Sequence, residues 1–384
     1  MKLLHTADLH IGKRVNEFSM LEDQAHILTQ ILLIAEEEKA DAVVIAGDVY
    51  DKAVPPLEAV QLFDWFLTEL NQRAIPVCVV TGNHDSTERV SFASRILEDR
   101  GVYVTPVYNG TVKPVELTDA YGKVKIWMLP FLKPAYVKRA FPEEELSTYQ
   151  QAVKFAVDQL PMDPSERNIL AAHQFVAGAI PGGSEDFLGA EGIDFQVGGI
   201  DLIDSSIFAA FDYTALGHIH RASSAGSPFV RYSGTPLKYS FSEEKHKKSV
   251  TLAELSEKGN VSCRQIPLFP RRELRTVCGS YDELTKKANY EGSKLDDYIR
   301  IILTDENDIP DAIGKLRSIY PNIMRLDYDN RRTRSRQTVD GLPRENQKSP
   351  LEHLEDFYIL QNNQPMSEEQ KAFAGEVIRS IWEM

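Results

Sequence analysis

An apolar run that ends in Gly-Asp is the feature that most constrains how this chain can fold. Residues Val43–Asp51 read VVIAGDVYD. A run rich in Val and Ile is typical of a strand buried in a parallel sheet. It stops at Gly47, and the carboxylate of Asp48 follows at once. Because ligands of open α/β sheets bind at the carboxyl ends of strands, a functional site is expected here if other strand ends bring matching side chains.

The amino-terminal part of the chain alternates between predicted strands and predicted helices. The strands are Lys2–Thr6, Asp41–Ala46 and Ile75–Thr81, and the helices are Leu21–Lys39, Pro55–Arg73 and Ser86–Asp99. This order predicts a parallel sheet with right-handed crossovers, and hence an α/β fold.

After Gly101 the pattern changes to short strands bounded by turn residues, which indicates mixed or antiparallel pairing. The predicted strands are Val102–Val107, Thr111–Leu117, Val124–Leu129, Asn168–Ala172, Phe211–Leu216, Phe229–Tyr232, Ser249–Leu255 and Ser262–Pro267. One helix is predicted at Glu143–Leu160. The glycine-rich stretch Val176–Gly199 is expected to be a loop close to the site.

At 384 residues the chain exceeds the roughly 250–300 residues at which one hydrophobic core stops growing. We predict a main domain over 1–268, a small α+β domain over 269–335, a polar linker over 336–349 and a helical segment over 350–384. In the last segment Phe373, Val377 and Ile381 form an apolar stripe. The stripe packs either on its own protein or on a partner, and the pattern does not decide between them.

The net charge of −14, taken alone, argues against nucleic-acid binding. The middle of the chain differs, because residues 266–340 carry 14 basic and 13 acidic side chains. Their densest stretch, Arg331–Arg336, holds four arginines and is either a solvated loop or a contact for phosphate. No apolar run has the ~20 residues of a membrane span. Three scattered cysteines fit a reduced, cytoplasmic location, and no signal peptide is expected.

Five predicted strand ends carry side chains that bind metals. Five of the nine histidines lie there, each near a carboxylate, an amide, a glycine or another histidine. A single buried histidine is usually a structural residue, but an ordered set of this kind rarely arises by chance. The motifs are Asp8-x-His10, Gly47-Asp48, Gly82-Asn83-His84-Asp85, His173 and Gly217-His218-x-His220.

Carboxylate, amide oxygen and imidazole together suit a divalent ion such as Mn²⁺, and the lack of thiolates argues against structural zinc. Seven ligands are too many for one ion and enough for two, if one carboxylate bridges. Asp48 has no histidine directly beside it in its motif and is the natural bridge. Two ions about 3.5–4 Å apart clamp a phosphate and provide a nucleophile at neutral pH.

Three further residues receive roles from their position beside the ligands. His84 follows Asn83 and can face the same phosphate, as a general acid or as a transition-state stabiliser. Asp51 and Asp85 are predicted to lie behind the ligands and to orient them.

These five motifs resemble the metallophosphoesterase superfamily, whose fold is a two-sheet sandwich flanked by helices. The stretches MKLLHTADLHIG, FDYTALGHIHRA and RYSGTPLKYSFSE are more narrowly similar to the DNA double-strand-break repair nucleases within it. The resemblance is strong over residues 1–265. It implies one ion held by Asp8, His10, Asp48 and His220, a second held by Asp48, Asn83, His173 and His218, and His84 as the catalytic histidine.

The resemblance also implies how the protein assembles. Its relatives form nuclease dimers, carry a small DNA-capping domain and use a carboxy-terminal helical segment to bind an ATPase with a long coiled coil. Residues 271–330 and 350–384 occupy the corresponding positions. This favours the partner-docking interpretation of the apolar stripe.

We therefore expect a Mn²⁺-dependent DNA phosphodiesterase that cuts duplex ends and hairpins. One alternative is a metallophosphoesterase that acts on a small phosphodiester or a phosphoprotein. Another is a catalytically inactive scaffold, against which the intact ligand set argues.

Overall fold

The computed structural model describes residues 1–177 and 202–330, with separate residues between 351 and 378. The run Arg331–Arg336, the predicted linker 336–349 and most of the predicted loop Val176–Gly199 lie outside the described residues. The chain divides into two compact units. One contains Met1–Thr304 and Ile309–Asp327, and the other contains Asp305–Asp308 and Tyr328–Met384.

The first sheet has six strands in the order β16-β15-β1-β4-β5-β6. As predicted, β1, β4 and β5 are parallel. β6 also joins this parallel part, at its edge, and β15 and β16 extend the sheet antiparallel beside β1. The bounds are β1 (Lys2–Thr6), β4 (Ala42–Ala46), β5 (Val77–Val80), β6 (Val102–Val104), β15 (Ser249–Leu255) and β16 (Val261–Pro267).

The second sheet also has six strands, in the order β13-β14-β12-β9-β8-β7. Its four central strands are parallel, and both edge strands run antiparallel to their neighbours, which confirms the predicted mixed pairing. The bounds are β7 (Val115–Asp119), β8 (Gly122–Leu129), β9 (Arg167–His173), β12 (Tyr213–Gly217), β13 (Ser223–Ala225) and β14 (Ser227–Tyr232).

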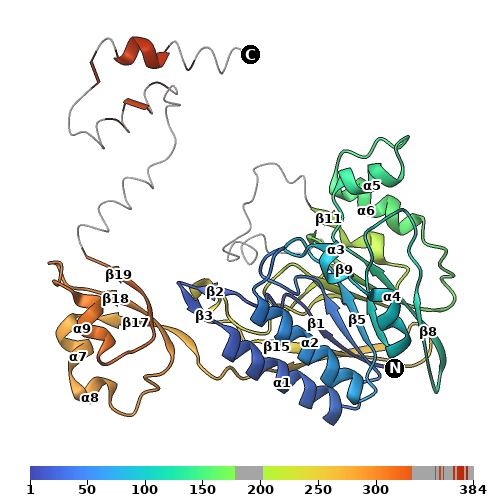
Figure 1. The fold of residues 1–384 in the computed structure, drawn as a ribbon, viewed down its shortest axis with the longest axis horizontal. Helices are drawn as coiled ribbons and strands as arrows, with labels where there is room; N and C mark the ends of the chain where they lie inside the picture. Colours follow the sequence, from blue (N-terminus) through green and yellow to red (C-terminus); the bar gives the residue numbers. More distant parts are fainter. Residues whose placement is uncertain are drawn as a thin grey trace. The chain divides into compact units, whose positions relative to one another are not determined.

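Strand β4 shows how the layers stack, because all of its residues are buried. Val43 and Ile45 point to one core, which the first sheet shares with α1 (Leu21–Glu37) and α2 (Leu57–Gln72). Val44 and Ala46 point to the opposite core, between the two sheets. The second sheet packs its other face on α5 (Pro134–Ala140) and α6 (Tyr149–Asp158). The result is the predicted two-sheet sandwich flanked by helices, with α1 and α2 in front in Figure 1.

The predicted helix Ser86–Asp99 is wrong as a single element. The segment forms α3 (Thr87–Val90), α4 (Ser94–Leu97) and the 3₁₀ turn η1 (Glu98–Arg100), with Ala93 between them at φ 60°. None of these residues is fully buried, and Val90 and Leu97 pack only partly buried against the core of the first sheet, so tertiary packing gives little support to a longer helix. The predicted helix Glu143–Leu160 begins later, because Thr148 and Gln151 form a capping box at its start.

Residues 274–328 form a separate three-stranded sheet, β17-β18-β19, with short helices beside it (Figure 1). Along the chain, the first strand is followed by two short helices, a strand, a helix and the last strand. The bounds are β17 (Leu274–Gly279), α7 (Tyr281–Thr285), α8 (Lys287–Tyr290), β18 (Tyr298–Leu303), α9 (Ala312–Arg317) and β19 (Ile323–Tyr328).

The remaining short elements lie in connections. They are β2 (Arg14–Val15), β3 (Phe18–Ser19), β10 (Val176–Ala177), β11 (Ile203–Asp204), η2 (Ser205–Phe208) and η3 (Phe241–Glu243). In the carboxy-terminal unit Ser367 and Gln370 exchange the two hydrogen bonds of a capping box. Among all the described residues, no helix is long and apolar enough to cross a membrane.

Candidate active site

All eight residues predicted to bind metal or to act in catalysis lie at one edge of the sandwich, at the carboxyl ends of five strands. Three of these strands belong to the first sheet and two to the second, so neither sheet alone contains the site. The order along the chain is Asp8 and His10 after β1, Asp48 after β4, Asn83 and His84 after β5, His173 at the end of β9, and His218 and His220 after β12.

The backbone at this edge is strained at four non-glycine residues. Asp8, His10, Asp48 and His218 have φ values of 52°, 44°, 49° and 104°. Positive φ is uncommon for side chains with a Cβ and costs about 1–3 kcal/mol per residue. Such residues concentrate where a fold holds functional groups in a fixed arrangement.

Two glycines let the strand ends approach closely. A Cβ at Gly217 would overlap the carbonyl oxygen of Ala46, so the second sheet could not meet β4 there. A Cβ at Gly82 would overlap Oδ1 of Asp48. The glycines of the motifs are therefore required by the contact between the two sheets and between neighbouring loops.

Asp48 lies at the centre of the site and is 2% exposed. Its Oδ2 is 3.4 Å from His173 Nε2, 3.8 Å from His10 Nε2 and 4.0 Å from His84 Nε2. Its Oδ1 accepts a hydrogen bond of 2.9 Å from the His84 backbone N–H. One carboxylate thus faces both halves of the predicted ligand set.

Asn83, His173 and His218 form one half of the site. Asn83 Oδ1 lies 3.1 Å from His173 Nε2 and 3.0 Å from His218 Nδ1. His173 Nδ1 lies 2.9 Å from the Ala46 carbonyl oxygen, which can only accept. This contact assigns a proton to Nδ1 and leaves Nε2 facing Asp48 and Asn83.

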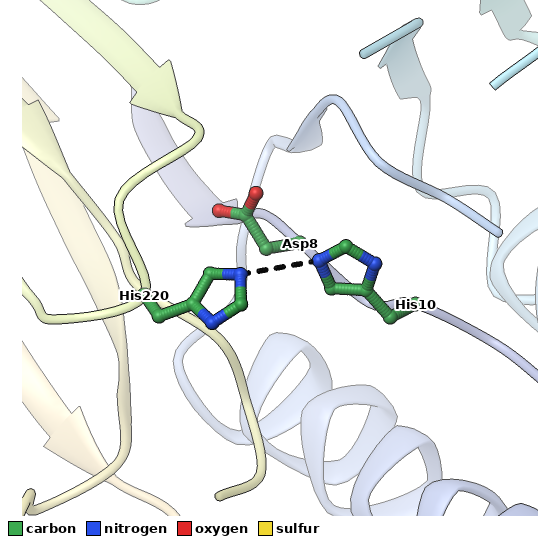
Figure 2. Close-up of side chains that lie close together, drawn as sticks. All are labelled: Asp8, His10 and His220. Carbon is green, nitrogen blue, oxygen red and sulfur yellow. Dashed lines mark hydrogen bonds between the residues drawn. The ribbon is translucent and has the colours of Figure 1, made fainter. Parts of the chain in front are cut away.

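Asp8, His10 and His220 form the other half (Figure 2). The Nε2 atoms of His10 and His220 face each other at 3.3 Å. The Asp8 carboxylate accepts from the His218 backbone N–H at 3.0 and 3.1 Å. Two lone pairs at 3.3 Å repel unless a proton or a cation lies between them, so this pair is arranged for a shared positive charge.

Burial sets the protonation states in the site. It raises the pKa of Asp8 to about 6 and lowers that of His218 to about 3. Burial also lowers the pKa of His10 well below its usual range. Burial alone would raise the pKa of Asp48, but the His173 imidazole and then His10 hold it below its ordinary value. Burial alone would lower the pKa of His173, but the carboxylates of Asp48 and Asp8 and the Ala46 carbonyl together raise it to about 9.

The donor set fits divalent metal ions. Asp8 and Asp48 are buried carboxylates, yet their close neighbours in the site are imidazoles and an amide rather than Lys or Arg. Three groups of carboxylate and imidazole atoms lie within 4.8 Å of one another, namely Asp8/His10/His220, His10/Asp48/His84 and Asp8/Asp48/His173. His10 Nδ1 is also buried without a hydrogen-bond partner among the described residues. Buried charges that lack a protein partner are commonly compensated by metal ions.

His84 lies at the mouth of the site, with 41% of its side chain exposed. Its Nδ1 donates to the carbonyl oxygen of Asp51 at 2.9 Å, which leaves Nε2 directed to the Asp48 side. The Asp51 side chain accepts from Lys13 Nζ at 2.6 Å and lies 3.8 Å from His10 Nδ1.

Asp85 ties two loops of the site together. Its carboxylate accepts from the backbone N–H groups of Val49, Tyr50 and Gly82 at 2.9–3.1 Å. Burial, with Asp48 nearby, raises its pKa to about 6. Asp85 therefore fixes the turns that carry Asp48 and Asn83.

Sequence reasoning missed Glu243, which lies directly behind His220. Glu243 Oε1 accepts from His220 Nδ1 at 3.2 Å, and its other oxygen pairs with the buried ammonium of Lys248. Lys248 also donates to Thr235 Oγ1 at 2.5 Å and to the His220 carbonyl at 3.0 Å. Burial alone would raise the pKa of Glu243, but the hydrogen bond from His220 and the ammonium of Lys248 lower it to about 2. In the sequence, the local pattern that could have indicated Glu243 is an acidic pair followed by the basic run KHKK.

Gln24 was also missed. It lies on the apolar face of α1, where its Nε2 donates to the His10 carbonyl at 2.7 Å and its Oε1 accepts from the Gly12 N–H at 3.0 Å. Tyr239 donates to the Leu9 carbonyl at 2.5 Å. These contacts fix the loop that carries His10, and a buried glutamine in an apolar stripe was the available clue.

Two known protein families match parts of this chain. Residues 1–222 match the model of the calcineurin-like phosphoesterases, and residues 270–362 match that of the type 5 capsule protein repressor C-terminal domain. The SbcD component of the nuclease SbcCD from Staphylococcus epidermidis is 34% identical over 329 residues, which cover 85% of each chain. Its counterpart from Staphylococcus saprophyticus is 33% identical over 85% of this chain and 84% of that one.

A solved dimetal phosphatase from Danio rerio covers 70% of this chain and 99% of its own, at 14% identity and a TM-score of 0.38. At that score the similarity adds nothing to the assignment. The sequence matches are sufficient: the chain belongs to the calcineurin-like phosphoesterase family, and within it to the SbcD nucleases. It is thus a metal-dependent nuclease that hydrolyses phosphodiester bonds.

Proposed function

We propose that this nuclease acts on DNA, as an exonuclease on duplex ends and as an endonuclease on hairpin or single-stranded structures, in DNA repair and recombination. The observation that carries the proposal is the convergence of seven potential ligands from five strand ends around Asp48, with His84 at the exposed mouth.

The ligands divide into two sets that share Asp48. Asp8, His10, Asp48 and His220 would hold one ion, and Asp48, Asn83, His173 and His218 would hold the other. The distances from Asp48 Oδ2 to His10 and His173 support the shared role. Mn²⁺ suits this mixture of oxygen and imidazole ligands. When bound, the two ions would polarise a phosphate and lower the pKa of a water molecule.

His84 would act on the leaving oxygen. Its Nδ1 proton is held by the Asp51 carbonyl, so protonation at Nε2 makes an imidazolium whose second proton faces the substrate side. That proton can pass to the departing oxygen, or the charge can stabilise the transition state. The Asp51 contact orients the ring in either case.

We further propose that residues 269–335 cap the DNA beside the nuclease domain 1–268, and that residues 350–384, after the linker 336–349, bind an SbcC-type coiled-coil ATPase. The relatives are components of SbcCD, which supports such a partner. In the carboxy-terminal unit, a hollow of about 320 Å³ is lined by Leu354, Tyr358, Met366, Gln370, Phe373, Ala374 and Ile378. Phe373 is 69% exposed there, as expected of a helix that docks.

A homodimer in the cytoplasm completes the proposal. Exposed apolar side chains at Val54, Leu57, Phe92 and Ile96 would supply a contact surface. The free cysteines Cys78, Cys263 and Cys278 suit a reducing compartment.

The test compares two substrates. Purified protein loaded with Mn²⁺ receives either end-labelled duplex and hairpin DNA or bis-p-nitrophenyl phosphate, with EDTA-treated protein as the control. Metal-dependent cleavage of the DNA supports the proposal. Hydrolysis of the small diester without DNA cleavage would reject it.

A further inference from the structure

A cavity of about 470 Å³ lies beside the metal-ligand candidate His220. It is bounded by the turn between η3 and β15, and we call it the lysine pocket. Its wall carries the cationic side chains of Lys245 and Lys247, and the described residues that line it include no Asp or Glu. The pocket is thus locally basic in a chain whose net charge is −14.

The two exposed lysines of the pocket differ from their neighbour Lys248. Lys248 is buried and neutralised by Glu243. Lys245 and Lys247 have no ion-pair partner among the residues that the structure describes. Two ammonium groups on one short turn repel each other. An anion bound between them would reduce this electrostatic repulsion, so binding of an anion is favoured.

Two polar atoms buried beneath the pocket surface also lack hydrogen-bond partners among the described residues. Ser249 is 5% exposed, and its Oγ is buried with no hydrogen-bond partner among the described residues. The same holds for Nδ1 of the half-buried His246. A hydroxyl, an imidazole nitrogen and ammonium groups are hydrogen-bonding groups that suit phosphate oxygens.

We propose that the lysine pocket binds a backbone phosphate of the DNA strand next to the phosphate that is cleaved. This inference rests on the proposed DNA substrate. The pocket adjoins His220, so a strand whose scissile phosphate lies at the metal site can place a neighbouring phosphate there. Such a contact positions the strand without reading its sequence.

The test is the double variant Lys245→Ala/Lys247→Ala. Its matched control is Lys123→Ala/Lys154→Ala, which removes two lysines that are 67% and 56% exposed on other surfaces. For the pocket variant, kcat/KM on duplex DNA should fall about tenfold or more, whereas kcat/KM on bis-p-nitrophenyl phosphate should not change. Binding to the same DNA in EDTA should lose about one unit of salt-dependence slope per phosphate contact.

The outcomes are distinguishable. If wild type cleaves DNA and the pocket variant behaves like its control, the inference is overturned and the proposed function stands. If the pocket binds free phosphate and not a DNA strand, the pocket variant will also behave like its control on DNA, and the inference is likewise overturned. If wild type hydrolyses only the small diester, the DNA substrate and the pocket assignment are both rejected.

Discussion

Glu243 Oε1 accepts a hydrogen bond from His220 Nδ1 at 3.2 Å, and this contact determines which nitrogen of His220 faces the candidate metal site. The carboxylate is 3% exposed and is neutralised from behind by Lys248. His220 is thus held in one tautomer by a residue 23 positions further along the chain.

Glu243→Gln should weaken metal binding without removing a ligand. The amide keeps the shape but loses the charge that orients the imidazole, and partners of this kind contribute about 10–100-fold in affinity. Titration of metal-free protein with Mn²⁺ in a calorimeter measures the effect. The control is Glu244→Gln, because Glu244 accepts instead from Thr276 at 2.7 and 2.8 Å. Equal affinities for the two variants would contradict the positioning role.

His84→Ser should abolish turnover while leaving the metals bound. General acid catalysis contributes roughly 10²–10⁴-fold, and His84 is not one of the seven proposed ligands. Cleavage of end-labelled duplex DNA measures the loss, and calorimetric Mn²⁺ titration checks that the ions still bind. Unchanged cleavage would refute the catalytic assignment, and loss of Mn²⁺ binding would make His84 a ligand instead.

Asp48→Ala should weaken both ions together, because the bridging position belongs to both ligand sets. The titration of this variant with Mn²⁺ should show neither of the two tight sites. His220, by contrast, belongs to one ligand set only, so the variant His220→Ala should keep one tight Mn²⁺ site. If Asp48→Ala also retained one site of wild-type affinity, Asp48 would not bridge.

Asp119→Asn should destabilise the second sheet in a pH-dependent way. Asp119 accepts from Arg167 Nη1 at 3.0 Å and Nη2 at 2.5 Å, and the Arg167 side chain is 5% exposed. These bonds hold the pKa of Asp119 below its usual value. The stabilisation is therefore complete above the unfolded pKa of about 3.9 and is lost as pH falls toward the folded pKa.

At pH 7 the loss should be about 2 kcal/mol, the scale of hydrogen bonds to charged groups. Urea unfolding of wild type and variant from pH 7 to pH 3 measures it, and the difference should shrink below about pH 4. The control is Glu116→Gln, on the same strand as Asp119, which removes an exposed ion-pair partner of Lys123. The free energy of unfolding of this control should change little at any pH. A difference that does not depend on pH would contradict the ionic origin.

Much of the fold could be predicted because its signals are local. The run at Val43 predicts a buried strand from its own composition, and the capping box at Ser367 and Gln370 depends on residues three apart. The helix predicted at Ser86–Asp99 failed because its local pattern carries no information about burial. Val90 and Leu97 pack against the core of the first sheet but stay partly exposed, and no residue of α3, α4 or η1 is buried. Tertiary burial decides whether a short helix is stable, and the sequence of the segment alone does not determine it.

The sequence by itself determined the alternation of strands and helices and the presence of ligand-type side chains at strand ends, since both follow from short-range patterns. Only the tertiary structure brought His10 Nε2 within 3.3 Å of His220 Nε2, placed Glu243 behind His220 and opened the lysine pocket beside it. These contacts join segments up to 210 residues apart. They depend on how closely two sheets meet, which is set by packing across the whole core and by glycines such as Gly217, where a Cβ would collide with the Ala46 carbonyl.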